Sequence, residues 1–191
     1  MKAATPEPQV RRRYLATMRA ATLSMWGQEG LDAVAAALPE DVRRATVEAP
    51  VVAEEWLPSR FVMDWVAAVW ATRAERQPKV FAQFIDLHTE LGFGRVRRFF
   101  LSFATPDMVV EKASALWKDD NRGGGELVVT VRGPGRATME LRDHVYATTQ
   151  LSRFCITELI RAILVRSRAA NVSARGTLGA NGALVMHFLW T

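Results

Sequence analysis

The feature that most constrains the fold of this chain is a change in the spacing of its apolar residues near residue 121. Before that point apolar side chains recur every three to four residues, which is the spacing of helices with one buried face. After the turn cluster at 121–125, Leu127, Val129 and Val131 fall at every second position, as in a strand with one buried face. The sequence therefore predicts helices followed by a sheet.

The residues after 125 predict the order β-β-α-β-β. The Gly-Pro-Gly sequence at 133–135 is a hairpin turn, and residues 137–141 alternate cleanly between apolar and polar. An amphipathic helix runs from about 148 to 168, and a second hairpin joins 172–177 to 183–190. We therefore expect an α+β fold in which the helical N-terminal two-thirds packs on a four-stranded antiparallel sheet.

Proline and glycine divide the helical part of the chain. The spacing predicts a helix over 58–72 with proline at its first position. Residues 78–103 have a long helical pattern, which Gly92 and Gly94 weaken by about 1 kcal/mol each relative to alanine, so we expect a kink or a break there. The Thr-Pro pair at 105–106 then supplies the N-cap and first residue of another helix.

Length and composition favour one intracellular globular domain. The 191 residues, 49% of them hydrophobic and 24% charged, fit a single domain over 1–191 with a flexible leader at 1–9. No run of about 18 uncharged apolar residues exists, so a transmembrane helix is excluded. The N-terminus lacks the apolar region of a secretory signal, and the single cysteine, Cys155, is typical of a reducing compartment. We expect a cytoplasmic protein.

The net charge of +5 and the pI near 10.0 raise the hypothesis of nucleic-acid binding. Arginine supplies 21 of the 25 basic residues, a bias that high-GC coding produces without any binding role. Twenty acidic residues are also interspersed along the chain. Nucleic-acid binding therefore ranks behind the hypotheses that follow.

The sequence contains no complete catalytic or metal-binding motif. Its glycine clusters at 123–125 and 133–135 lack the lysine and hydroxyl of a nucleotide-binding loop. His88, His144 and His187 pair with no histidine, cysteine or carboxylate at a metal-ligand spacing. No nucleophile elbow supports a serine or cysteine nucleophile. We therefore predict a protein that is not an enzyme, with no catalytic residue, metal or cofactor.

Five residues are candidates for lining a ligand pocket: Phe84, His88, Phe100, Trp117 and Cys155. The chain's six tryptophans can fill a core or line an apolar pocket. His88 follows Phe84 by one helical turn, a position that fits either a pocket-facing or a half-exposed histidine. Cys155 lies on the apolar face of its helix, where an inert buried thiol and a ligand contact are both consistent with the pattern.

Short motifs run along nearly the whole chain: Gly27-Gln28-Glu29-Gly30 with Ala37-Leu38-Pro39, Trp56-Leu57-Pro58, Leu91-Gly92-Phe93-Gly94, Thr105-Pro106-Asp107 before Leu116-Trp117, and Ser173-Ala174-Arg175-Gly176 before Phe188-Leu189-Trp190. Together they resemble a family of paralogous proteins of similar length found mainly in myxobacteria.

The β-β-α-β-β part resembles the vinyl-4-reductase-type small-molecule-binding domain, which is related in fold to TRAPP-complex subunits and heme-based nitric-oxide sensor domains. The resemblance implies an apolar pocket between helices and sheet and a sensory or scaffolding role. The stretch 185–188 lacks the cysteine that related domains often carry, and the tyrosine-serine-arginine signature of the heme sensors is missing. Neither heme nor a cysteine-dependent site is therefore carried over.

Two hypotheses about function follow. The first is a non-enzymatic sensory or regulatory domain that binds a small apolar ligand in a pocket between helices and sheet. The second is a protein-protein interaction module, a self-associating adaptor in intracellular signalling. Such a module would dock a protein partner, or a second copy in a homodimer, through arginine and tryptophan anchors.

Overall fold

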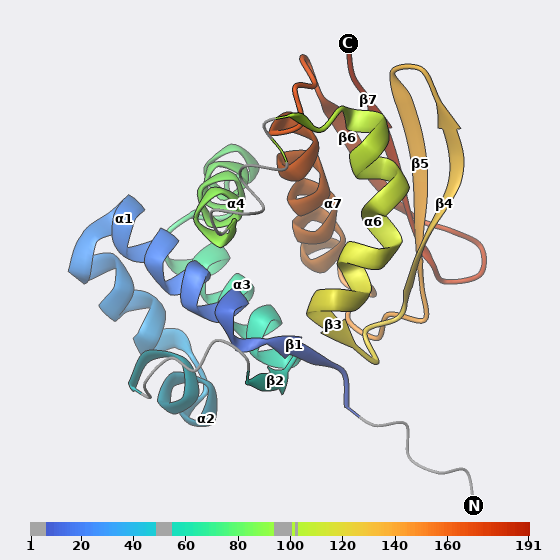
Figure 1. Ribbon diagram of the computed structural model, residues 1–191. Helices are drawn as coiled ribbons and strands as arrows, with labels where there is room; N and C mark the ends of the chain where they lie inside the picture. Colours follow the sequence, from blue (N-terminus) through green and yellow to red (C-terminus); the bar gives the residue numbers. More distant parts are fainter. Residues whose placement is uncertain (1–6, 49–54, 94–100, 102) are drawn as a thin grey trace, which may run out of the picture.

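The chain folds into a helical layer and a four-stranded sheet, with two helices between them (Figure 1). The computed structural model describes residues 7–48, 55–93, 101 and 103–191. The pocket candidate Phe100 therefore lies outside the described residues. The expected α+β class is confirmed.

Helices occupy most of the first 120 residues, and four longer strands follow. The helices are α1 (Arg12–Ala37), α2 (Glu40–Arg43), the π-helical η1 (Arg44–Glu48), α3 (Arg60–Thr72), α4 (Pro78–Gly92), α6 (Pro106–Asp120) and α7 (Gln150–Val165). The strands are β1 (Gln9–Arg11), β2 (Trp56–Pro58), β3 (Asn121–Arg122), β4 (Glu126–Gly133), β5 (Arg136–Arg142), β6 (Ser173–Leu178) and β7 (Leu184–Leu189).

The four longer strands form the predicted antiparallel sheet, in the order β4-β5-β7-β6. Met139 of β5 lies opposite Met186 of β7 in the register, and both side chains are fully buried on the inner face. The turn between β4 and β5 requires Gly135, whose φ is 69° and whose added Cβ would lie 2.8 Å from the Trp190 carbonyl oxygen. The structure thus confirms the predicted strands and the buried faces of β5 and β7. On β4, Val131 was expected to share the buried face of Leu127, but it is 46% exposed because the register shifts between Val129 and Val131.

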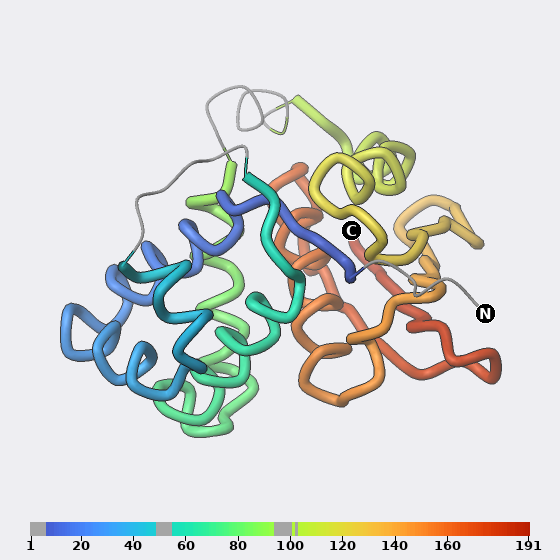
Figure 2. The backbone as a smooth tube through the Cα atoms, turned by 90° about the horizontal axis from the view of Figure 1, so that it is seen from below, coloured from blue at the N-terminus to red at the C-terminus, as the bar shows by residue number. Residues whose placement is uncertain are grey.

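Helix α7 separates two hydrophobic cores. Cys155 packs into the core formed with α1, α3 and α4, whereas Ile156 and Ile160 pack with α6 and the sheet. Figure 2 shows the two halves on either side of α7. The N-terminal helices therefore reach the sheet mainly through α7, which is apolar on two faces, and α6 and α7 themselves cover the sheet.

A small three-stranded sheet, β2-β1-β3, was not predicted. Pro58, expected to begin a helix, instead ends β2, because Trp56–Pro58 pairs with Gln9–Arg11 and α3 begins only at Arg60. The Ser59 N–H donates to the Pro8 carbonyl at 2.8 Å. Residues 8 and 9, assigned to a flexible leader from the sequence, are thus held against the fold.

The break expected in the pattern 78–103 occurs where the sequence indicated. Helix α4 ends at Gly92, and Phe93 has extended backbone angles. Further on, the Thr105 hydroxyl accepts a hydrogen bond from the Met108 N–H at 3.3 Å, which confirms the predicted N-cap of α6. Among the described residues, no helix is long and apolar enough to cross a membrane.

Candidate functional site

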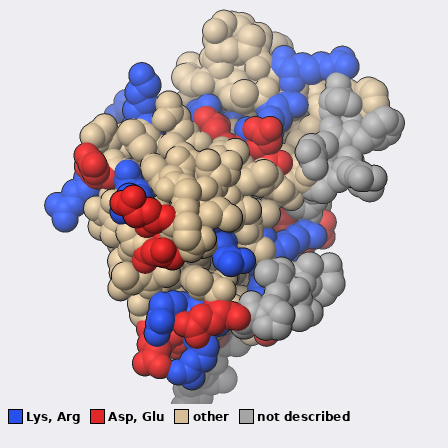
Figure 3. Space-filling view, turned by 90° about the vertical axis from the view of Figure 1, so that its left-hand side faces the viewer, with Lys and Arg blue, Asp and Glu red and all other residues tan. Residues whose placement is uncertain are grey.

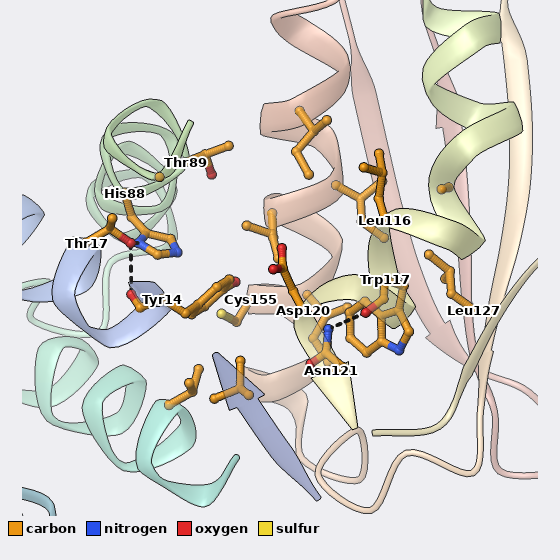
Figure 4. A pocket seen from close by; sticks show the side chains of 18 of the residues that line it. Tyr14, Thr17, His88, Thr89, Leu116, Trp117, Asp120, Asn121, Leu127 and Cys155 are labelled. Carbon is orange, nitrogen blue, oxygen red and sulfur yellow. Dashed lines mark hydrogen bonds between the residues drawn. The ribbon is translucent and has the colours of Figure 1, made fainter. Parts of the chain in front are cut away.

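A largely apolar cavity lies between the two cores, where α1, α3 and α4 face α6, α7 and the sheet (Figure 4). Its volume is about 180 Å³. Much of its wall is made of aliphatic and methionine side chains: Val10, Val62, Met63, Leu101, Val109, Ala113, Leu116, Leu127, Met139, Ile156, Leu159, Ile160 and Ile163. An engineered apolar cavity of about 150 Å³ stays dry and binds benzene or xenon, so this one has room for a small apolar molecule.

The structure brings three of the sequence candidates, His88, Trp117 and Cys155, to the wall of this cavity. Phe84 is placed elsewhere. It is fully buried in the N-terminal core, where its ring stacks on Trp26 with the centroids 5.7 Å apart. On α4, Phe84 therefore packs into the core, whereas His88, one helical turn later, lines the cavity.

Sequence reasoning missed Tyr14 and Thr17, which face the cavity from α1. Their spacing of three residues places them on one side of a helix, and this spacing was the only local sign that the two side chains share a site. It was not sufficient, because nothing local relates residue 14 to His88 on α4.

His88 is the most enclosed polar group at the site, with only 2% of its surface exposed. Its Nδ1 lies 3.0 Å from the Thr17 hydroxyl oxygen. The Tyr14 ring packs edge-on against the imidazole, with the centroids 4.5 Å apart. Burial lowers the pKa of His88 to about 4, so the side chain is neutral at neutral pH.

Tyr14 and Cys155 are held in their protonated forms. Burial raises the pKa of Tyr14 well above its usual value, and the nearby Cys155 and Asp120 add to the effect. Burial likewise raises the pKa of the Cys155 thiol to about 12. Figure 4 shows the hydroxyl end of Tyr14 directed toward Cys155 and Asp120. A thiol with so high a pKa is a poor nucleophile, so this arrangement suits binding better than covalent chemistry.

A second polar pair lines the opposite side of the cavity. The rings of Trp117 and His144 lie with their centroids 5.7 Å apart, and burial lowers the pKa of His144 to about 4. The Trp117 Nε1 and the His144 Nδ1 are buried and have no hydrogen-bond partner among the described residues. Buried polar atoms without partners are costly, so a ligand or water that bonded them would stabilise the site.

Solved structures show which fold this arrangement belongs to. The Fe(II) unliganded H-NOX protein from K. algicida matches with a TM-score of 0.62 at 8% identity, over 95% of this chain and 96% of that chain. The chain has an H-NOX-like fold. An H-NOX protein from S. oneidensis in the Fe(II) ligation state, a mutant, has a TM-score of 0.61 at 10% identity, over 95% and 96% of the two chains. An oxygen-binding H-NOX domain related to soluble guanylate cyclases has a TM-score of 0.59 at 12% identity, over 95% of each chain.

These H-NOX likenesses establish the fold alone, because the identities are so low. They support the sequence resemblance to heme-based nitric-oxide sensors at the level of fold, and they give no support to the resemblance to the myxobacterial family. No protein-family model and no curated protein matches the chain.

The residues at the cavity do not fit the heme group that H-NOX proteins imply. The cavity of about 180 Å³ is smaller than the roughly 300–1,000 Å³ typical of pockets for drug-sized ligands, and a porphyrin is a ligand of that class. In its wall, Tyr14 and Cys155 are kept protonated by burial, so neither is suited to hold iron as a phenolate or a thiolate.

Proposed function

We propose that this chain is a non-enzymatic sensory or regulatory domain that binds a small, mostly apolar ligand in the cavity between α1, α3 and α4 on one side and α6 and α7 on the other. The observation that carries the proposal is the cavity itself, about 180 Å³ of space walled chiefly by apolar side chains. Protein interiors are otherwise closely packed, so a space of this size is unusual unless something occupies it. The H-NOX-like fold supports a sensory role, since an oxygen-binding domain is among its neighbours.

The self-associating adaptor is supported less well. Large exposed apolar side chains lie on separate elements, for example Leu23 on α1, Leu91 on α4 and Leu189 on β7. We retain the prediction of a single cytoplasmic domain over 1–191.

Nucleic-acid binding is not favoured by the distribution of charge. On the face shown in Figure 3, acidic and basic side chains are interspersed around a broad uncharged area. Near α2, Arg44 pairs with Glu40 at 2.5 Å, and Arg60 pairs with Asp41. Nucleic acid is bound by contiguous basic surfaces that neutralise phosphates, and paired arginines are less suited to that role.

Benzene is a suitable probe of the cavity, because it fits an apolar space of this size. Ala113 of α6 lines the cavity, whereas Ala115 on the same helix is exposed. We expect benzene to raise the melting temperature of the wild type and of Ala115→Leu, because a ligand that binds only the native state stabilises it. Ala113→Leu places an isobutyl group in the cavity and should abolish the shift.

Two results would count against the proposed function. One is a wild-type protein whose melting temperature does not respond to benzene and whose NMR spectrum is unchanged by it. The other is an Ala113→Leu variant that responds as strongly as Ala115→Leu, since binding would then lie outside this cavity.

A further inference from the structure

Thr17 joins Tyr14 and His88 through two hydrogen bonds that determine where the imidazole carries its proton. The Thr17 hydroxyl donates to the Tyr14 carbonyl oxygen at 2.8 Å, one helical turn earlier on α1. A hydroxyl has one proton, so its 3.0 Å contact with the His88 Nδ1 requires the ring N–H to be the donor. In the neutral imidazole Nδ1 is then protonated, and Nε2 carries a lone pair.

This Nε2 lone pair faces the cavity. His88 lines the cavity wall, and Figure 4 shows its ring projecting from α4, with Thr17 beside the Nδ1 edge of the ring. Among the described residues Nε2 makes no hydrogen bond, and only 2% of the side chain is exposed. A ligand that covered this acceptor without donating to it would bury it unpaired at a cost, so the cavity favours a ligand that brings a donor to this atom.

The Tyr14 hydroxyl provides a complementary group. Tyr14 lines the same cavity, and its ring lies against the imidazole of His88. Its hydroxyl makes no hydrogen bond with the described residues and remains protonated, so it is able to donate. A single hydroxyl group on a ligand can accept a hydrogen bond from the Tyr14 hydroxyl and donate one to the Nε2 of His88.

We infer that the ligand of this cavity is a small apolar molecule bearing one hydroxyl group, such as a phenol or a short alcohol. The hydroxyl donates to the Nε2 of His88 and accepts from the hydroxyl of Tyr14. Its apolar body lies against the aliphatic wall, which includes Val109, Leu127 and Ile160. This inference rests on the proposed function, since it names the class of ligand for the same cavity.

Phenol and toluene, which differ by a hydroxyl in place of a methyl group, test the inference by isothermal titration calorimetry. We expect the wild type to bind phenol at least about 10-fold more tightly than toluene, since its hydroxyl makes two hydrogen bonds that toluene lacks. His88→Leu should bind both with similar affinity. Thr17→Val keeps the side-chain shape but removes the acceptor for Nδ1–H, so it should also reduce the preference for phenol over toluene.

The outcomes separate the two proposals. Equal wild-type affinities for phenol and toluene overturn the inference and leave the proposed function standing, whereas no binding of either overturns both. A preference for phenol that survives in His88→Leu also overturns the inference. If that variant does not fold, ¹⁵N NMR of the wild-type imidazole decides instead: a protonated Nδ1 supports the inference, and a protonated Nε2 overturns it.

Discussion

Arg161 of α7 donates hydrogen bonds from one guanidinium nitrogen to both carboxylate oxygens of Asp86 on α4, each at 2.8 Å. Its Nε also donates to Glu158 on α7 at 2.6 Å. These contacts connect α4 and α7, the helices that carry the cavity residues His88 and Cys155. The ion pair between α4 and α7 therefore helps to set the width of the candidate site.

Arg161→Met should destabilise the protein because it leaves Glu158, which is 9% exposed, without its cation. Removing one partner of a buried pair costs about 3–5 kcal/mol, and the partial exposure of Asp86 lowers the expected loss to about 2–3 kcal/mol. Urea denaturation measures this. Arg44→Met, which removes an exposed pair with Glu40, is the matched control and should cost no more than about 0.5 kcal/mol. Equal losses in the two variants would contradict the role assigned to Arg161.

The stability of the protein should fall in mild acid because of His88. Its pKa is about 4 in the folded protein and near the ordinary value of 6.5 in the unfolded chain, so only the unfolded chain takes up a proton between these values. Stability is therefore fully present above pH 6.5 and is lost as the pH falls toward 4, by about 3 kcal/mol in all.

Denaturant titrations between pH 7 and pH 4.5 check this dependence on pH. His88→Leu should lose stability less steeply over that window than the wild type, by roughly 1.4 kcal/mol per pH unit. His144, whose pKa is lowered by burial in the same direction, should account for part of the slope that remains. Identical slopes in the variant and the wild type would show that His88 does not stay neutral in the folded protein.

Cys155 should be unreactive in the native protein. The side chain is 3% exposed, and burial raises its pKa to about 12, so very little thiolate is present at pH 8. An aromatic disulfide reagent at pH 8 should detect no thiol in the native chain and one thiol per chain in denaturant, since Cys155 is the only cysteine. Rapid stoichiometric labelling of the native protein would mean that the cavity opens readily at this helix.

Gly176 of β6 allows α7 to approach the sheet closely. A Cβ added at this position would lie 2.3 Å from the Thr157 hydroxyl oxygen on α7. Gly176→Ala should therefore lower the free energy of unfolding by about 1–3 kcal/mol, the usual cost of overpacking. Thr157→Ala removes the obstructing oxygen, so the double variant should recover much of that loss in a double-mutant cycle. Losses that simply add would show that the contact is not the cause.

Much of the sheet and part of the cavity wall could be predicted because the signals are local. Alternation over a few residues assigned Met139 and Met186 to the buried face, and hairpin turns then set their pairing. The apolar faces of single helices were enough to single out His88 and Cys155. Strands β1, β2 and β3 have only two or three residues each, too few for alternation to be recognised.

The sequence by itself determined the α+β order, the buried faces of β5 and β7, and three residues of the cavity wall, His88, Trp117 and Cys155. Only the tertiary structure decided that Tyr14 and Thr17 meet His88, and that Phe84, one turn away on α4, packs into the core instead. The reason is physical: periodicity identifies which side of a helix is buried, but the packing of α1 on α4 and of both against α7 determines where side chains leave space between them.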